Sequence, residues 1–469
     1  MARLEWQKLL SPVRFSDRLA PPLPHLPVPD WAIPHQRTSA ERDFDRVLYA
    51  TPIRRLADKT QVFPLEENIS IRTRLTHSHE VANLARAVGL HLVHAWFPKI
   101  EAAEQMPADY RRDIPAMLAT VGLAHDMGNP PFGHTGEEAI GSWFRQKIAS
   151  DSAFALRFGE IAKPDDFLKF EGNAQTLRLL TKLQVGDRSF GFNLTCGTLG
   201  AMMKYTVGSD RVNPAVAATK KFGFFASERE TATMIFAETG LVPGLRHPLA
   251  FIMEACDDIA YTVLDTEDMV KKRLVTFGDV MDWLQQGADD VIDYVVAKSK
   301  NDRETHALLG LSEAELDDVS MQGFRTHAIH AMVTHLIHAF DSQYEDIMQG
   351  RQARDLIACS GVARLRDRLK EFDRRHGYES ANVRQRQQNG IEAIHRLMDR
   401  LWVGIAGQHE GDKAAEIYLR ISENYRRQFE KDKAGTIFTA QCRLLTDMVS
   451  GMTDSYTISL GDALTQMAA

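Results

Sequence analysis

The sequence predicts an all-α protein with a predominantly helical fold. From Ser39 onward, apolar residues recur at the 3.6-residue spacing of amphipathic helices. Runs with the alternating, β-branched pattern of strands are few, and no segment repeats with a fixed period. Together these observations favour packed helices over a sheet or a repeat architecture.

The length and composition are those of a globular protein. The chain has 469 residues, of which 44% are hydrophobic and 25% are charged, so a collagen-like or largely disordered chain is excluded. At roughly 150 residues per domain, this length allows about three domains. We expect an arm at 1–38, a core that carries the functional site at 39–280, and a helical region at 281–469 that completes the site and makes subunit contacts.

Two segments are predicted to lack regular structure. Seven prolines lie between Pro12 and Pro34, and such close spacing disfavours both a helix and a central strand, so the arm is expected to be extended. The glycine-rich stretch 185–223 is expected to be irregular.

Charge, hydropathy and cysteine content limit the partners and the compartment. Lys and Arg number 56 against 63 Asp and Glu, a net charge of −7, so no global basic surface attracts nucleic acid or a membrane. No window approaches 18 consecutive apolar residues, and the N-terminus is charged where a signal peptide is apolar. The four isolated cysteines predict neither a disulfide framework nor a cysteine-based zinc site. We expect a cytoplasmic protein with no membrane association.

Four helices are predicted to carry the chemistry. Their apolar stripes place them at 76–96, 115–128, 173–183 and 248–264. Pro115 suits the first turn of the second helix. Farther along the chain, Ser227 and Glu230 have the spacing of a capping box and predict the start of another helix.

Adjacent His125 and Asp126 lie in the last turn of the second predicted helix, directly before the loop MGNPPFGH. Adjacent side chains on a helix diverge by about 100°, so both reach one ion only where the helix frays into a loop. A lone histidine–aspartate pair is common by chance and also suits a capped helix end. The position of this pair is the one that an ion site requires.

The fourth predicted helix carries carboxylates on an otherwise apolar surface. Asp257 and Asp258 lie within FIMEACDDIAYTVLD, where a buried carboxylate without a partner is costly, so at least one is expected to meet a cation. Asp257, Tyr261 and Asp265 follow at four-residue intervals and drift only about 80° around the axis, so they share one face.

The remaining ligand is expected from the first helix, where RTRLTHSHEV offers His77 and His79. These two residues point about 200° apart, so only one of them reaches the ion. His77 lies four residues before Val81 of the apolar stripe and is therefore selected, whereas His79 faces away.

Two histidines and two aspartates make a mixed nitrogen and oxygen metal site. Such a site suits Mn²⁺, Fe, Co²⁺, Ni²⁺ or Zn²⁺, whereas Mg²⁺ binds imidazole ligands less readily. We expect a divalent metal ion as cofactor, with Mn²⁺ or Mg²⁺ as first candidates and Fe, Co, Ni or Zn as alternatives.

These residues and their order resemble the HD superfamily of metal-dependent phosphohydrolases, and the deoxyguanosine triphosphate triphosphohydrolases in particular. The histidine–aspartate pair alone is a weak signal, but the combination of motifs is very specific and extends from Thr51 to Tyr456. The matching segments are TPIRRLADKTQVFPLEENISIRTRLTHSHEV, GLAHDMGNPPFGHTGEEAI, KFEGNAQTLRLLTKLQ, NLT, MKY, ACDDIAYTVLDTED and DMVSGMTDSY.

The resemblance implies an HD-domain fold with helical insertions and a role for each matching residue. Metal ligands would be His77, His125, Asp126 and Asp257, and an acid–base pair near the α-phosphate would be His134 and Glu137. The other implied contacts are with substrate: Gln61 and Asp265 at the 3′-hydroxyl, Tyr261 at the sugar, and Arg74, Lys204 and, more weakly, Asn173 at the phosphates.

The resemblance also implies an activity and partners. The expected reaction is hydrolysis of dGTP to deoxyguanosine and inorganic triphosphate. The expected partners are dGTP or another dNTP, further copies of the chain in a homo-oligomer for which a hexamer is one candidate, and single-stranded DNA or a nucleotide as effector.

Two positions depart from the family pattern. His79 stands where the family usually has Leu or Met, and Asn129 stands where many relatives have His. The asparagine resembles the subgroup best known for a preference for dGTP. The residues that recognise the base are not identifiable in the less regular C-terminal sequence.

Two other functions stay open. One is a different phosphohydrolase of the superfamily, with broad dNTP specificity or a phosphodiester substrate, although FEGNAQ, KTQVFP and GMTD argue against a phosphodiesterase. The other is a non-enzymatic nucleotide sensor, which the intact metal-binding set and the pair His134 and Glu137 argue against.

Two clusters are interpreted as structural. Four histidines share one predicted helix, at His327, His330, His335 and His338, but no carboxylate lies among them and their neighbours are apolar, so partly buried helix positions are favoured over a second metal site. The arginine-rich run 351–386 mixes both signs of charge and predicts a solvated helix face, with a nucleic-acid or effector contact as the alternative.

Overall fold

The protein is built almost wholly from helices. A computed structural model describes residues 3–19, 37–66, 68–184, 190–379, 381–407, 412–431 and 435–468. Within these ranges no strand forms, and the extended segments make only isolated β-bridges such as that between Thr60 and Thr73. The all-α prediction is confirmed. No helix of the described part of the chain has the length and apolar character needed to cross a membrane.

The first part of the chain supplies the helices that surround the site. In chain order they are α1 (Trp6–Leu9), α2 (Ser39–Leu48), α3 (Thr51–Arg55), α4 (Arg74–His91), α5 (Tyr110–Ala124), α6 (His134–Ser150), α7 (Ser152–Phe158), α8 (Asp165–Leu168), α9 (Gly172–Arg178), α10 (Cys196–Met202), α11 (Arg229–Thr239) and α12 (Pro248–Lys271). Two of these helices, α4 and α9, each continue into one π-helical turn.

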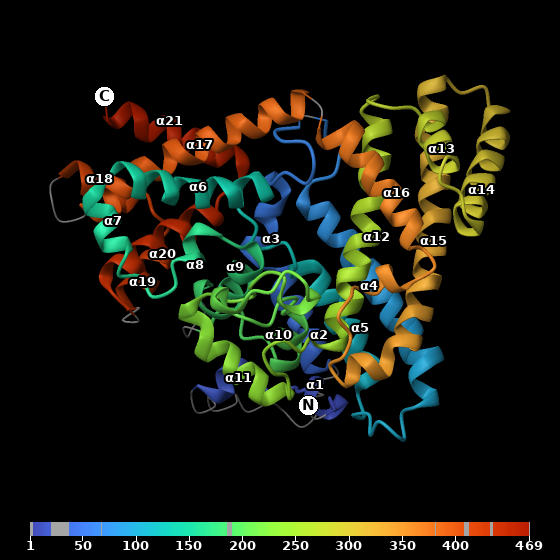
Figure 1. Cartoon of the computed structure of the whole chain (residues 1–469), viewed down its shortest axis with the longest axis horizontal. Helices are drawn as coiled ribbons and strands as arrows, with labels where there is room; N and C mark the ends of the chain where they lie inside the picture. The colour runs from blue at the N-terminus through green and yellow to red at the C-terminus, as the bar shows by residue number, and fades with distance from the viewer. Residues whose placement is uncertain are drawn as a thin grey trace, which may run out of the picture.

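The second part of the chain packs on both sides of this set. Its helices are α13 (Phe277–Gln285), α14 (Asp290–Ala307), α15 (Glu313–Met348), α16 (Ala363–Asp373), α17 (Ala381–Ala406), α18 (Asp412–Leu419), α19 (Glu423–Lys431), α20 (Ile437–Ser450) and α21 (Asp454–Ala468). Figure 1 shows α15 beside α12, with α13 and α14 at one corner, and α17 with α21 across the opposite side, where α17 contacts α6.

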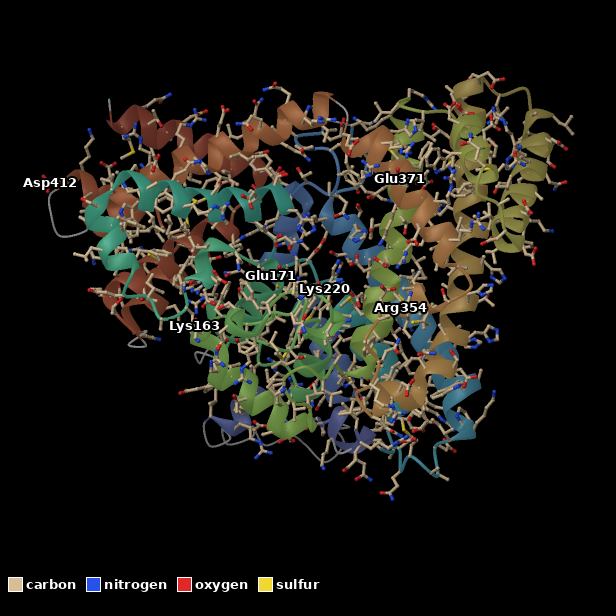
Figure 2. All side chains as sticks on the ribbon, in the orientation of Figure 1. Lys163, Glu171, Lys220, Arg354, Glu371 and Asp412 are labelled. Carbon is tan, nitrogen blue, oxygen red and sulfur yellow. The ribbon has the colours of Figure 1, made fainter. Side chains whose placement is uncertain are left out.

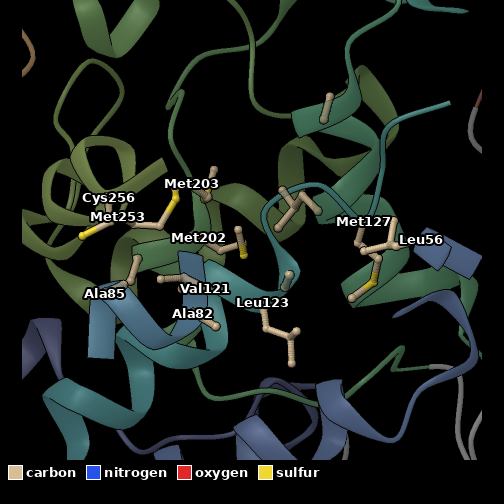
Figure 3. Close-up of a cluster of buried hydrophobic side chains, with 14 of the residues drawn as sticks. Leu56, Ala82, Ala85, Val121, Leu123, Met127, Met202, Met203, Met253 and Cys256 are labelled. Atoms are coloured by element: carbon tan, nitrogen blue, oxygen red, sulfur yellow. The ribbon is translucent and has the colours of Figure 1, made fainter. Parts of the chain in front are cut away.

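Small apolar side chains let the site-bearing helices pack closely. Ala82 and Ala85 of α4 are buried against α5, and Figure 3 shows them beside Val121 and Leu123. Residues from α10 and α12 complete the same cluster, including Met202. This packing brings His77 of α4 and Asp257 of α12 close to His125 and Asp126, which directly follow α5.

The first residues of the chain are not an extended arm, which corrects the prediction for this part. Trp6 is fully buried in α1, its ring lies edge-on to Phe97 with 5.0 Å between centroids, and its indole N–H donates to the Tyr344 hydroxyl at 2.8 Å. The short helix before Pro12 is stabilised because its apolar residues Trp6 and Leu9 are buried in the core. The proline-rich residues 20–36 lie outside the described residues.

One continuous hydrophobic core extends across all three predicted regions, from Leu4 to Leu464. The division at residues 38 and 280 stays a prediction.

Three local predictions were wrong. The second site helix begins at Tyr110, so Pro115 lies inside α5, because the buried Tyr110 and Ile114 extend the apolar stripe before the proline. Ser227 does not cap α11; its hydroxyl donates to Glu228 at 2.9 Å within a short 3₁₀ turn. The stretch 190–223 is not wholly irregular, because Thr195 caps α10 by accepting a hydrogen bond from the backbone of Thr198.

Candidate metal and phosphate site

Four predicted side chains converge where α4, α5 and α12 meet. His77 Nε2 lies 3.1 Å from Asp257 Oδ1, and His125 Nε2 lies 3.4 Å from the same oxygen and 3.5 Å from Asp126 Oδ1. His77, His125 and Asp126 can each offer one ligand atom within a space of 4.8 Å. His77 is buried and His79 is exposed, as the helix periodicity predicts.

The histidines are oriented as metal ligands would be. His125 Nδ1 donates to the carbonyl oxygen of Gly122 at 2.7 Å, which orients the ring so that Nε2 points at the cluster. The buried Nε2 of His125 has no hydrogen-bond partner. A buried nitrogen without a partner beside two carboxylates fits a divalent cation, because the ion would satisfy the imidazole and neutralise the carboxylates.

The electrostatics of the cluster favour positive charge. Burial disfavours a charged ring at His125, but Asp126 and Asp257 more than offset it and raise its pKa to about 9. Burial likewise opposes ionisation of Asp257, yet the pKa of this carboxyl is held well below its ordinary value by His125, His77 and Lys204. The carboxylates are therefore ionised and attract a cation.

Two side-chain cations flank the cluster. The buried Arg74 guanidinium contacts Asp126 Oδ2, and Lys204 Nζ lies 4.0 Å from Asp257 Oδ2 and 3.5 Å from Glu254. Burial would lower the pKa of Lys204, but Glu254 and Asp257 raise it above its ordinary value, so the ammonium stays charged. These positions suit oxygens of a polyanion bound beside the carboxylate cluster.

Asn129 adds a contact to the cluster. Its side-chain amide donates to Asp126 Oδ1 at 2.6 Å, so both oxygens of Asp126 accept hydrogen bonds from the protein. In the sequence, Asn129 differs from the family pattern but is not predicted to contact the metal ligands. In the structure this amide orients a candidate ligand.

The candidate acid–base pair starts α6. His134 Nδ1 lies 2.7 Å from Glu137 Oε2, and Glu137 Oε1 accepts a hydrogen bond from the backbone of Gly172 at 2.8 Å. The hydrogen bond to Glu137 and its negative charge raise the pKa of His134 above its ordinary value. The His134 side chain is 81% exposed while Glu137 is buried, so the ring is anchored on one side and open on the other.

Lys221 and Glu171 lie near this pair and were not predicted as site residues. Lys221 Nζ lies 2.8 Å from Glu171 and 3.9 Å from Glu137. In the view of Figure 2, Glu171 and the neighbouring Lys220 fall near the middle of the molecule, whereas Asp412 lies at its edge. Lys220 and Lys221 lie in an irregular stretch, where the sequence pattern does not indicate which way their side chains point.

The face of α12 beyond Asp257 is partly enclosed by the C-terminal half of the chain. Tyr261 is half-buried, with Lys370 Nζ 4.9 Å from its ring centre. Asp265 is buried, its carboxylate accepts a hydrogen bond from the Tyr378 hydroxyl, and burial raises its pKa to about 7. Tyr378 was not predicted, because it lies more than a hundred residues away at the end of a π-helical turn.

Two further predicted substrate contacts, Gln61 and Asn173, have no hydrogen bond to the four candidate ligands. Gln61 is half-buried and its side-chain oxygen has no partner. Asn173 begins α9, and its side-chain amide donates to Glu171 at 2.6 Å rather than pointing at the carboxylate cluster.

The arginine-rich run is not only a solvated face, which corrects that interpretation. Arg366 is 9% exposed and lies 3.4 Å from Asp258, and Lys370 lies 3.1 Å from the same carboxylate. Asp258 therefore meets cations of α16, whereas its neighbour Asp257 faces the histidines. In the histidine-rich part of α15, His327 Nε2 lies 2.7 Å from Asp302, and no metal-binding cluster forms there among the described residues.

The chain is similar to known proteins over nearly its whole length. The sequence is 33% identical, over 437 residues, to a deoxyguanosinetriphosphate triphosphohydrolase-like protein of Listeria monocytogenes, covering 90% of this chain and 92% of the relative. It is 32% identical to a protein of the same description from Synechocystis, covering 96% and 97%. It is 28% identical to a deoxyguanosinetriphosphate triphosphohydrolase of Salmonella arizonae, covering 89% and 91%. No family model matches the chain.

Proposed function

The chain belongs to the deoxyguanosinetriphosphate triphosphohydrolase family, and on this premise we propose that it hydrolyses dGTP to deoxyguanosine and inorganic triphosphate. The observation that carries the proposal is the convergence of His77, His125, Asp126 and Asp257 beside two cations and a histidine–glutamate pair. A structural ion-pair cluster would need no exposed proton-transfer group.

A divalent metal ion would be held by His77, His125, Asp126 and Asp257. Bound there, it would supply Lewis-acid chemistry, polarising a phosphoryl oxygen and activating water at neutral pH. Mn²⁺ is the first candidate because imidazole and carboxylate ligands suit it.

The protein's own cations would bind the triphosphate. A nucleoside triphosphate carries about four negative charges near neutral pH, and Arg74 and Lys204 offset part of them through charge-assisted hydrogen bonds. Arg74 also holds Asp126, so one guanidinium couples the phosphate position to the ligand set.

His134 would transfer a proton at the attacking or the leaving oxygen. Glu137 accepts the hydrogen bond from Nδ1, so the exposed Nε2 is the atom that faces substrate. Attack of water at the α-phosphorus breaks the bond to the 5′ oxygen, which leaves as deoxyguanosine after it gains a proton, and the three phosphoryl groups leave together.

Product analysis tests the proposal directly. The purified protein would be incubated with each of the four dNTPs and Mn²⁺, and the products would be separated by ion-exchange chromatography. The proposal predicts deoxyguanosine and triphosphate from dGTP. Release of dGMP with pyrophosphate, or of orthophosphate, would refute it, and equal turnover of all four dNTPs would instead identify a broad-specificity enzyme. A homo-oligomer and an effector site for single-stranded DNA or a nucleotide stay predictions.

A further inference from the structure

The loop that joins Asp126 to His134 contains a backbone conformation that needs external support. Phe132 has φ of +59° and Gly133 has φ of +58°. A positive φ is energetically costly for a residue with a side chain, so it persists only where contacts with the surrounding structure stabilise it. Glycine is favoured at 133 by this φ, which side chains rarely adopt, and a Cβ there would also lie 2.3 Å from the end of the Arg74 side chain.

One carboxylate from the far end of the chain supplies that support. Asp454, the first residue of α21, is 2% exposed. Its Oδ1 accepts a hydrogen bond from the backbone N–H of Phe132 at 2.9 Å. Its Oδ2 accepts from the backbone N–H of Thr60 at 3.0 Å and from the Thr60 hydroxyl. Asp454 therefore joins the strained turn to the segment that carries Gln61.

Two other contacts hold the same loop. Lys59 is buried, and its Nζ donates to the carbonyl oxygens of Asn129 at 2.5 Å and Ser450 at 2.8 Å. The buried Phe132 ring packs against α17 at Gly390, where a Cβ would lie 2.9 Å from Phe132 Cγ. The loop is thus fixed at its beginning, at its strained residue and at its ring, by groups that touch none of the candidate metal ligands.

We propose that Asp454 is a positioning residue for His134: by holding the Phe132 turn, it sets where α6 begins and hence where the His134 ring lies over the substrate. The proposal rests on the proton-transfer role given to His134 under the proposed function. It also accounts for the sequence motif GMTD near the C-terminus, which the active-site residues leave without a role. An asparagine at this position would keep one acceptor oxygen but could not accept from both Phe132 and Thr60.

A double-mutant cycle between Asp454→Asn and His134→Ala tests the proposal. In the wild-type background, Asp454→Asn is expected to lower kcat about 10- to 100-fold, the loss typical of a misplacement of about 1 Å, while KM for dGTP and bound Mn²⁺ change less than about 2-fold. In the His134→Ala background the same substitution is expected to change kcat less than about 2-fold, because the group that it positions is gone.

Asp43 provides a matched control. It is fully buried and likewise accepts hydrogen bonds from the backbone and hydroxyl of a threonine, Thr195, but it lies in α2, pairs with Arg14 and has no hydrogen bond to the loop. Asp43→Asn is expected to lower the thermal midpoint and to leave kcat per folded molecule unchanged in both backgrounds. Thr60→Val, a milder change to the same contact, is expected to repeat the Asp454→Asn pattern with a smaller loss.

The outcomes separate the two claims. If His134→Ala itself leaves kcat unchanged, the proton-transfer role fails. If His134→Ala lowers kcat but the losses from Asp454→Asn and Thr60→Val multiply with it, the positioning role is wrong. If Asp454→Asn does not fold, the Thr60→Val cycle alone decides by the same criterion.

Discussion

Two of the buried clusters of charge in this protein differ in how completely their atoms are paired. The first is the candidate metal site, where His125 Nε2 has no hydrogen-bond partner. The second lies between α9 and α20, where Arg178 donates to Asp447 at 2.7 and 2.8 Å and to Glu228 at 2.8 Å. All three residues of the second cluster are nearly inaccessible to solvent.

The difference distinguishes a binding site from a structural contact. A buried charge without its partner is strongly destabilising, so a cluster whose only task is stability is expected to be paired internally, as Arg178 is. A histidine nitrogen left without a hydrogen bond beside ionised carboxylates is instead free to bind a cation from outside the chain. We therefore assign the first cluster to function and the second to stability, and the following substitutions test that assignment.

The largest expected effect is the loss of activity in Asp257→Ala. The substitution removes the carboxylate that both histidines approach, so the metal site loses a ligand and kcat is expected to fall more than about 100-fold, beyond the usual cost of losing an outer contact. Steady-state kinetics with dGTP would measure it. His79→Leu, an exposed change on the same helix as His77, is the control and is expected to stay within about 2-fold.

The next effect is on stability, in Arg178→Met. Removing the guanidinium leaves Glu228 and Asp447 buried without a cation, and the free energy of unfolding is expected to fall by about 3–5 kcal/mol. Denaturant unfolding would measure it, with kcat per folded molecule nearly unchanged. Arg145→Met, which removes an exposed pair with Glu138, is expected to change stability by less than about 1 kcal/mol. A large loss of kcat at constant stability in Arg178→Met would contradict the assignment.

The paired cluster also predicts a pH dependence. Burial would raise the pKa of Glu228, but Arg178 and Lys182 lower it to about 2, against an ordinary value of 4.5 in the unfolded chain. Its contribution to stability is therefore complete above about pH 4.5 and is lost as the pH falls towards 2. In Arg178→Met this part of the acid destabilisation is expected to disappear, which unfolding curves between pH 5 and 2 would show.

A smaller effect on catalysis is expected from Glu137→Gln. The hydrogen bond and charge of Glu137 raise the pKa of His134, so a neutral glutamine would lower it, and the limb of the pH profile that reports this histidine would move to lower pH. We expect kcat to fall about 10-fold, less than the loss of the proton-transfer group itself. Glu138→Gln, one residue along the same helix and exposed, should leave the profile in place. An unchanged profile in Glu137→Gln would remove Glu137 from this role.

The last expected effect, on substrate selectivity, concerns the choice of sugar. Tyr261 lies one helical turn beyond Asp257, so its ring is expected beside the sugar of a nucleotide whose α-phosphate is at the metal. A ring packed at C2′ leaves no room or partner for a 2′-hydroxyl. Tyr261→Ala is expected to reduce the preference for dGTP over GTP about 10-fold in kcat/KM. Equal use of dGTP and GTP by the wild type would show that this residue does not set sugar selection.

The sequence predicted the residues of the candidate site better than it predicted the residues that hold them in place. Helix periodicity was sufficient to separate His77 from His79 and to place Asp257, Tyr261 and Asp265 along one helix, because those relations depend on a single element. Lys59, Tyr378 and Asp454 could not be found in this way. Tyr378 and Asp454 contact the site region from distant parts of the chain. Lys59 is close to Gln61 in the sequence, but only the tertiary fold brings it to the loop at Asn129.

The same limit explains the errors in the fold. Periodicity identified the four helices that carry the candidate site, whereas α1 and α10 are short and were not predicted, and α1 is buried against distant partners such as Tyr344. Pro115 suggests a helix start, but the buried Tyr110 and Ile114 extend α5 before the proline. Local turn chemistry was overridden by packing at each of these positions.

The dependence of stability on metal tests the central claim most directly. Chelator-treated wild type and Asp257→Ala would be unfolded by denaturant with and without Mn²⁺. If the unpaired cluster is a metal site, Mn²⁺ at about 100 times its Kd stabilises the wild type by about 2.7 kcal/mol and leaves Asp257→Ala unchanged. No stabilisation of the wild type, or equal stabilisation of both proteins, would contradict the assignment of this cluster to metal binding.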